Sequence, residues 1–504
     1  MSPPFNVLTA TAAELQQSLT IGTLTSVQIV ETYLAQIEKH NHAGAHLNAV
    51  ISVAPRELAL KQAAKLDQER QEGKTRSPFH GLPIIVKDCF QIGPEMGMKT
   101  TAGAYCFSLE QAKENAEVIT QLLDKGIIIL GTANLSEFCG HKAEEMTPGW
   151  SAMGGRTRSA YDLDSDPNVL PKPWWFAPCG GSSSGSGVGV SAGFVPMSLG
   201  TETGGSLVYP ASRAGLYAMR PTLGSVSSKG VFRISKTYDG VGAMARTPYD
   251  LSLLVELILK HGSKHASESG FGKYLTKSWE GLKIGIVEVT WGMGSQEGKD
   301  KWTSDLVKRN YDGVAQKIRD NGGHVLFPAS PPEPSTIKYQ DLVMRDIAYQ
   351  EFNEVIQIFC DGFENPKVRT AKDIVKFNEE HADKAMPEPH ANQKELIASS
   401  ESSLTEEQCA TARSEIQRLA GKDGMEKYMT DNDLDLVVSS SDCSLISFTS
   451  CAGYPSATVP LGNLENGQPY GLFILARENR EDLMFRFMSA FEATFPKIKG
   501  PNLV

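Results

Sequence analysis

Two glycine–serine turns with an apolar segment between them constrain this chain more than any other feature. The turns are Gly180-Gly181-Ser182 and Gly204-Gly205-Ser206, and their serines lie 24 residues apart (206 − 182). Glycine allows sharp turns and a close approach of the backbone to a ligand. A solvated linker would not carry the apolar side chains found between the turns, which are Val188, Val190, Phe194, Val195, Met197 and Leu199. The segment is therefore interpreted as buried structure that presents two serines from tight turns.

Helical and strand patterns alternate in the first half of the chain. Apolar spacing predicts two helices within Thr11–Lys39, broken at Gly22, with Thr25 or Ser26 capping the second. Further helices are predicted over Arg56–Glu72 and Ala116–Lys125, and another beginning near Asn134 or Ser136; buried strands are predicted over Gly81–Asp88 and Ile127–Leu130. This alternation implies an α/β layer architecture with a partly parallel sheet.

The sequence pattern of the second half of the chain predicts one more strand–helix–strand unit and a helical insert. The unit comprises a strand over Leu282–Val289, a helix over Ser304–Asp320 and a strand over His324–Phe327. Glu333–Lys427 is charged and poor in glycine, as expected of a helical cap. Strands at Leu434–Ser439 and Ala457–Pro460 and a closing helix at Arg480–Thr494 return to the core.

We expect four parts within one domain. They are N-terminal helices (1–75), a catalytic core (76–260), an α/β unit with the helical insert (261–430) and a C-terminal return to the sheet (431–504).

Composition narrows the classes of function. The net charge of −10 over 504 residues argues against general attraction to nucleic acid or to anionic membranes. No run of 18 apolar residues predicts a membrane span, and the N-terminus lacks the pattern of a secretory signal. The eight cysteines are scattered, which favours reduced thiols and a cytoplasmic location. No metal-binding motif occurs, and we interpret His40, His42 and His46 as an exposed polar loop, so no metal or other cofactor is expected.

Three familiar glycine-rich motifs fit the serine turns poorly. A phosphate-binding loop needs a lysine at its end, and no lysine lies between Gly180 and Arg213. A dinucleotide-binding turn needs a preceding strand and an acidic residue about 20 positions on, and this context is missing. The hydrolase elbow G-x-S-x-G is not matched around Ser186.

Several segments in a fixed order resemble the amidase signature family. They are Gly81-Leu-Pro-Ile-Ile-Val-Lys87-Asp88, Gly180-Gly-Ser-Ser-Ser-Gly185, Thr203-Gly-Gly-Ser206, Gly215-Leu-Tyr-Ala-Met-Arg-Pro-Thr222, Met244-Ala-Arg-Thr-Pro-Tyr-Asp250, and Ala452-Gly-Tyr-Pro455 through Val459-Pro-Leu-Gly462. The matches run from about residue 11 to about residue 495. The resemblance implies the family's fold, in which a large mixed sheet is covered by helices on both faces.

The resemblance also implies a catalytic triad. Ser206 would be the nucleophile, and Ser182, preceded by a cis peptide bond, would link it to Lys87. The backbone N–H groups of Thr203, Gly204, Gly205 and Ser206 would form the oxyanion hole. A serine hydroxyl needs a base to take its proton, so the Lys87 amine must be neutral, a form that burial among apolar neighbours favours. Because successive side chains of a strand point to opposite faces, Asp88 should face away from Lys87.

Two positions depart from the family pattern. Glu202 stands where the family usually has aspartate, and Val208 stands where it usually has arginine. A buried carboxylate without a partner is costly. Glu202 is therefore expected to be protonated or to pair with another cation, and Arg213 and Arg220 are the candidates.

The expected activity is hydrolysis of a small-molecule carboxylic amide through an acyl-enzyme. Met153, Trp174, Trp175 and Ser183 are candidate substrate-binding residues. Acyl transfer to an amine, the role of an amidotransferase subunit, and a catalytically idle binding protein remain alternatives. Family members are often dimers, which makes a homodimer one candidate assembly, and the sequence does not identify the amide.

Overall fold

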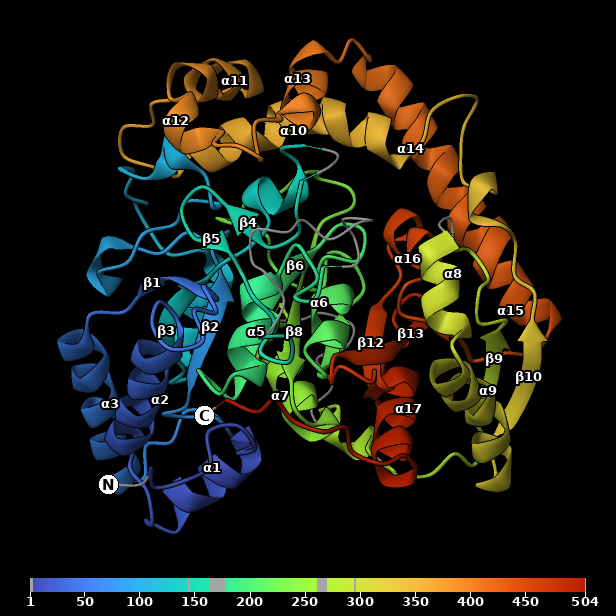
Figure 1. Ribbon diagram of the computed structural model, residues 1–504, viewed down its shortest axis with the longest axis horizontal. Helices are drawn as coiled ribbons and strands as arrows, with labels where there is room; N and C mark the ends of the chain where they lie inside the picture. The colour runs from blue at the N-terminus through green and yellow to red at the C-terminus, as the bar shows by residue number, and fades with distance from the viewer. Residues whose placement is uncertain (1–2, 144–145, 164–176, 261–269, 294–295, 504) are drawn as a thin grey trace.

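A single large mixed sheet forms the centre of the molecule. The computed structural model describes residues 3–143, 146–163, 177–260, 270–293 and 296–503 (Figure 1). Eleven strands pair in the order β1-β3-β2-β6-β8-β7-β12-β13-β11-β9-β10, and β4 and β5 form a separate pair. The strands are β1 Val50–Val53, β2 Pro83–Lys87, β3 Ile128–Ala133, β4 Trp150–Ser151, β5 Gly155–Arg156, β6 Met197–Glu202, β7 Tyr217–Arg220, β8 Gly240–Ala245, β9 Lys283–Val287, β10 His324–Ala329, β11 Leu436–Ser440, β12 Ser456–Asn463 and β13 Pro469–Ala476.

The sheet contains both parallel and antiparallel pairs, which confirms the α/β expectation. β2 runs parallel to β3 and β6, while β8, β7, β12 and β13 add antiparallel pairs. β9 pairs in parallel with β10 and β11, which confirms the predicted strand–helix–strand unit. β2, β3, β6, β11 and β13 are buried at every position, so both faces of the sheet are covered.

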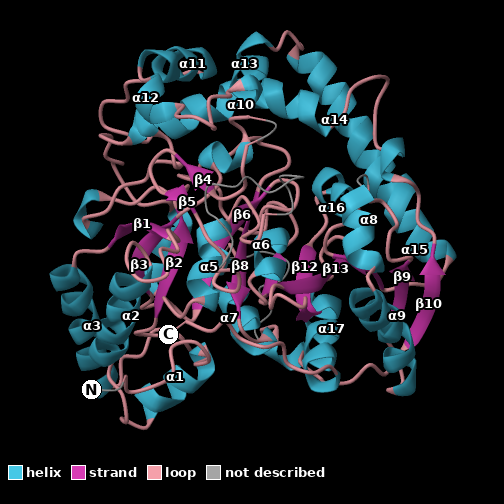
Figure 2. Ribbon diagram, viewed as in Figure 1, coloured by secondary structure: helices cyan, strands magenta, loops and turns pink. Residues whose placement is uncertain are grey.

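Helices cover the sheet and build an arch above it (Figure 2). They are α1 Ala12–Thr20, α2 Ser26–His40, α3 Arg56–Gln71, α4 Glu117–Asp124, α5 Ser184–Ser191, α6 Val208–Arg213, α7 Pro248–Ile258, α8 Gln296–Thr303, α9 Asp305–Asp320, α10 Met344–Asp361, α11 Ala371–Glu380, α12 Ala382–Ala385, α13 Lys394–Glu401, α14 Glu406–Ala420, α15 Lys427–Asp431, α16 Ile446–Ala452 and α17 Glu481–Thr494. The arch consists of α10 to α14 and corresponds to the predicted helical insert (Figure 1). Within the described residues, no helix is both long and apolar enough to cross a membrane.

Local capping explains where the N-terminal helices begin. Thr25 precedes α2, and its side chain accepts a hydrogen bond from the Gln28 N–H in a capping box. Thr11 makes the same arrangement with Glu14 before α1. Such boxes satisfy N–H groups that the first helical turn leaves without a partner, and both predicted helices are confirmed.

The prediction of a helix that begins near Asn134 or Ser136 is wrong. The chain makes a short 3₁₀ turn, η3 (Glu137–Gly140), in which Phe138 and Cys139 have φ of 53° and 57°. The Phe138 N–H donates to the Ala102 carbonyl, a tertiary contact that a continuing α-helix could not make. Tertiary packing overrides the local helical pattern here. The structure also contains α5, which the sequence did not reveal because its glycines and serines are weak helix formers.

Glu202 and Arg220 form an ion pair inside the sheet. Both side chains are fully buried, and the Arg220 Nε lies 3.3 Å from the Glu202 Oε1. The other oxygen, Oε2, accepts the N–H groups of Leu207 (3.1 Å) and Val208 (3.0 Å), and the Ser456 hydroxyl donates to Oε1. Arg220 is therefore the cation that pairs with Glu202, as one of the two candidates from the sequence. Arg213 instead pairs with Asp442.

Replacing Arg220 tests this pair. Arg220→Met removes the cation and leaves a buried carboxylate, so the free energy of unfolding should fall by about 3–5 kcal/mol. Arg56→Met is the control, because Arg56 pairs with Glu31 at the surface, with exposed fractions of 55% and 44%, and such pairs contribute about 1 kcal/mol or less. Urea titrations of both variants measure the difference. Equal losses would contradict a structural role for the buried pair.

Candidate active site

A buried lysine lies at the end of strand β2. The Lys87 side chain is 0% exposed, and its Nζ donates to the Ser182 hydroxyl and to the Thr201 hydroxyl, each at 2.8 Å. Thr201 lies on β6, which pairs in parallel with β2. The strand pairing therefore brings together the Lys87 amine and the Thr201 hydroxyl, which are 114 residues apart in sequence.

Asp88 turns away from Lys87. Its carboxylate accepts the N–H groups of Thr101 (3.1 Å) and Gly103 (3.1 Å), and the Thr101 hydroxyl also donates to it. Burial raises the pKa of Asp88 to about 7, while these donors act in the opposite direction. The carboxylate thus fixes the loop that follows β2 and leaves the amine without an acidic neighbour on its own strand.

The two glycine–serine turns are joined directly. The peptide bond before Ser182 is cis, and the Ser183 N–H donates to the Ser206 carbonyl at 3.0 Å. In the second turn, Gly205 has a φ of 101°, and a Cβ there would lie 2.3 Å from the Tyr209 ring. Glycine is therefore required at this position by both backbone conformation and space.

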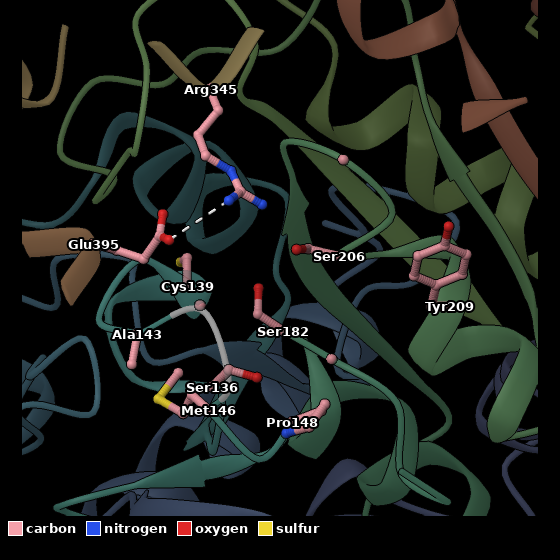
Figure 3. A pocket seen from close by; sticks show the side chains of 13 residues that line it. Ser136, Cys139, Ala143, Met146, Pro148, Ser182, Ser206, Tyr209, Arg345 and Glu395 are labelled. Carbon is pink, nitrogen blue, oxygen red and sulfur yellow. Dashed lines mark ion pairs between the residues drawn. The ribbon is translucent and has the colours of Figure 1, made fainter. Parts of the chain in front are cut away.

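Both serine hydroxyls point into one cavity (Figure 3). The cavity has a volume of about 240 Å³ and is lined by Ser136, Cys139, Gly140, Ala143, Met146, Pro148, Gly181, Ser182, Gly204, Ser206, Tyr209, Arg345 and Glu395. Ser182 is buried, whereas Ser206 is partly exposed. Among the described residues, no hydrogen bond joins the two hydroxyls, so the direct contact found is the one between Lys87 and Ser182.

The backbone of the second turn offers hydrogen-bond donors. Across the described part of the chain, the N–H groups of residues 203–206 donate to no acceptor. Unsatisfied N–H groups beside a serine hydroxyl can hold the oxygen of a tetrahedral intermediate. The four residues expected to form an oxyanion hole therefore have donors available.

The candidate substrate-binding residues fall in different places. The Ser183 hydroxyl donates to the Thr201 carbonyl at 3.1 Å, and Met153 donates its N–H to Gly103; neither residue lines the cavity. Trp174 and Trp175 lie outside the described residues.

The sequence analysis missed several residues in and around the cavity. Thr201 lies five positions before Ser206 (206 − 201), on the apolar segment that leads into the second turn. This position was the signal in the sequence that could have placed Thr201 near the serines. Arg345 and Glu395 come from helices of the arch, and no local pattern marks them.

Cys139 places a thiol in the cavity beside the buried lysine. Its Sγ lies 3.8 Å from the Thr201 hydroxyl, as does the Sγ of Cys89. Burial opposes ionisation, but the hydrogen bond with Cys89 and the positive charge of Lys87 outweigh it and lower the pKa of Cys139 to about 6.

Comparisons with known proteins find relatives that are amidases or similar to them. A family model described as Amidase matches residues 28–485. A probable amidase of Arabidopsis thaliana is 30% identical over all of this chain and 93% of its own length. One of the subunits of the glutamyl-tRNA(Gln) amidotransferase from Chloroflexus aurantiacus is 33% identical over 60% of this chain and 58% of its own. The structure of a native peptide amidase from Stenotrophomonas maltophilia superposes with a TM-score of 0.85 at 27% identity, over 98% of this chain and 99% of that one.

Alkylation of Cys139 should close the cavity. Iodoacetamide is expected to modify this thiol and to block labelling of Ser206 by an organophosphonate, because the added group would fill space beside both serines. Cys139→Ser should remain reactive with the phosphonate after the same treatment, and Cys179→Ser, which changes a buried thiol outside the cavity, should behave like the wild type. Peptide mass spectrometry measures both modifications. Full phosphonate labelling of a protein alkylated at Cys139 would contradict the placement of Cys139 and Ser206 in one cavity.

Proposed function

The chain belongs to the amidase family, and from that premise we propose that it hydrolyses a linear carboxylic amide with Ser206 as nucleophile and Ser182 and Lys87 as the proton relay. The hydrogen bond between the Lys87 amine and the Ser182 hydroxyl carries this proposal. It couples a buried base to a hydroxyl that faces the same cavity as Ser206. Membership of the family makes the protein a hydrolase that acts on amides.

The proposed reaction begins with attack on the amide carbonyl. The Ser206 oxygen bonds to the carbonyl carbon, its proton passes to the Ser182 oxygen, and the Ser182 proton passes to the Lys87 nitrogen. The carbonyl oxygen becomes an oxyanion, which the N–H groups of residues 203–206 stabilise. The relay then returns a proton to the amide nitrogen, the C–N bond breaks, and ammonia or an amine leaves an ester on Ser206.

Water completes the cycle by the same route. It attacks the ester while the relay accepts one of its protons, and collapse of the second tetrahedral intermediate breaks the C–O bond to Ser206. The proton returns to the Ser206 oxygen and the carboxylic acid is released. Neither half-reaction requires a metal or an organic cofactor.

Two alternatives use the same residues. In acyl transfer, an amine would take the place of water in the second half-reaction. An amidotransferase subunit would instead release ammonia to a partner chain. The similarity to an amidotransferase subunit keeps the second alternative open. Hydrolysis of amides by the purified chain at an ordinary rate would argue against the amidotransferase subunit, whereas a catalytically idle protein would not react with the phosphonate.

Location and assembly remain part of the proposal. All eight cysteines are free and buried, which suits a reducing, cytoplasmic compartment. We retain a homodimer as the candidate assembly, and the four sequence-defined parts as one domain around the common sheet.

The nucleophile is tested by Ser206→Ala. The variant should lose at least about a thousandfold in kcat on any amide that the wild type hydrolyses, because the hydroxyl proposed to form the ester is removed. An organophosphonate should add one adduct to the wild type, mapped to Ser206, and none to the variant. Ser186→Ala is the matched control, since its hydroxyl donates to the Leu199 carbonyl inside the protein. Retained activity in Ser206→Ala, or an adduct elsewhere, would refute the assignment.

A further inference from the structure

Two thiols share one hydroxyl group with the buried Lys87 amine. The Sγ atoms of Cys89 and Cys139 each lie 3.8 Å from the Thr201 Oγ1, and the Lys87 Nζ donates to the same oxygen at 2.8 Å. A hydrogen bond also joins the two thiols. Cys89 lies two positions after Lys87 (89 − 87), whereas Cys139 belongs to the turn η3. Two distant segments of the chain therefore place a pair of thiols beside the proposed base.

The two thiols differ in access and in ionisation. Cys139 lines the cavity with Ser182 and Ser206 (Figure 3), whereas Cys89 is 0% exposed and does not line it. Although burial acts against ionisation, the hydrogen bond with Cys89 and the charge of Lys87 lower the pKa of Cys139 to about 6. Burial raises the pKa of every other cysteine of the chain. Because oxidants react with the thiolate, Cys139 is the thiol that a small oxidant in the cavity attacks first.

Both cysteines lie in turns and not in a paired strand. Cys89 follows the end of β2 in a turn, and Cys139 has a φ of 57° in η3. A disulfide holds its two sulfur atoms about 2.05 Å apart, which is closer than the sulfur atoms of two hydrogen-bonded thiols, so one or both turns must shift. Turns accommodate such a shift more easily than paired strands do. A reactive thiol next to a second thiol is also the arrangement typical of redox sensors.

We propose that Cys139 and Cys89 are a site of reversible oxidation by hydrogen peroxide, and that the disulfide between them switches the proposed catalytic site off. The Cys139 sulfur attacks a peroxide oxygen, the O–O bond breaks, and the thiol becomes a sulfenic acid as one water leaves. The Cys89 sulfur then attacks the Cys139 sulfur, the S–O bond breaks, and a second water leaves with the Cys89 proton. The two thiols lose two electrons, and the peroxide gains them. A dithiol reverses the reaction by thiol–disulfide exchange.

The disulfide acts on the site through the position of Lys87. Drawing Cys89 toward Cys139 moves the chain two residues from Lys87, and it alters the contacts of both sulfur atoms with the Thr201 hydroxyl that holds the amine. A displacement of about 1 Å in a catalytic site can cost about a hundredfold in rate. Formation of the bond does not depend on the proposed amide hydrolysis, whereas its effect on Ser206 does.

Peptide mass spectrometry without reductant tests the bond. Purified full-length protein treated with hydrogen peroxide should yield two peptides linked through Cys89 and Cys139, and dithiothreitol should separate them. Cys89→Ser should instead gain oxygen at Cys139, because the second thiol is missing. Cys106 and Cys360, which are buried near each other and outside the cavity, are the control pair and should stay reduced. Wild-type protein in which Cys139 stays reduced, or is oxidised without a link to Cys89, would overturn the proposal.

The rate of phosphonate labelling at Ser206 tests the effect on the site, with each protein compared with itself before and after oxidation. Peroxide should lower the wild-type rate by at least about tenfold, since a shift of less than about 1 Å suffices for this, and dithiothreitol should restore it. The rate in Cys139→Ser should not respond to peroxide, and Cys106→Ser should respond like the wild type. Labelling of disulfide-linked protein at the full rate would overturn the switch. Absence of labelling in reduced, folded protein would overturn the proposed function instead, while the linked peptides would still form.

Discussion

The hydrogen bond from the buried Lys87 amine to the Ser182 hydroxyl is the contact on which the rest of the site depends. It is 2.8 Å long and joins the end of β2 to the turn before α5, two segments that lie 95 residues apart in sequence. The Thr201 hydroxyl, also 2.8 Å from the amine, holds it from β6. The Ser183 N–H then ties the first turn to the Ser206 carbonyl. The sheet and the two turns thus hold Lys87, Ser182 and Ser206, the proposed base, relay and nucleophile, in one site.

The charges around the lysine are arranged to leave it unpaired with any carboxylate of the described residues. Asp88, its neighbour in sequence, is turned into the loop at residues 101–103. Glu202 lies close to the nucleophile turn but pairs with Arg220 and accepts two backbone N–H groups. An adjacent carboxylate would favour the ammonium form, and an ammonium cannot accept a proton. The pairing of Glu202 with Arg220 leaves this carboxylate engaged away from Lys87.

Local sequence patterns predict those elements whose conformation is set by neighbouring residues, such as capped helices. The helices that begin after Thr11 and Thr25 are predicted correctly because apolar spacing and capping residues agree there. The turn at Cys139 has a helical pattern in sequence, but its conformation depends on a contact with a loop far away along the chain. The expected triad residues follow from the family resemblance, and the structure brings Lys87 to Ser182. The arch residues of the cavity have no signal, since their position is set by how the helices pack over the sheet.

The most direct test of the account is the rate at which Ser206 is labelled when Lys87 is removed. Lys87→Ala leaves a cavity next to Ser182 that methylamine can enter as a substitute base. A general base contributes about 10²–10⁴-fold, so we predict a fall of that size in the phosphonate labelling rate of Ser206. Methylamine should restore part of the rate in Lys87→Ala and none in Ser206→Ala. Labelling of Lys87→Ala at the wild-type rate would contradict the proposed proton path.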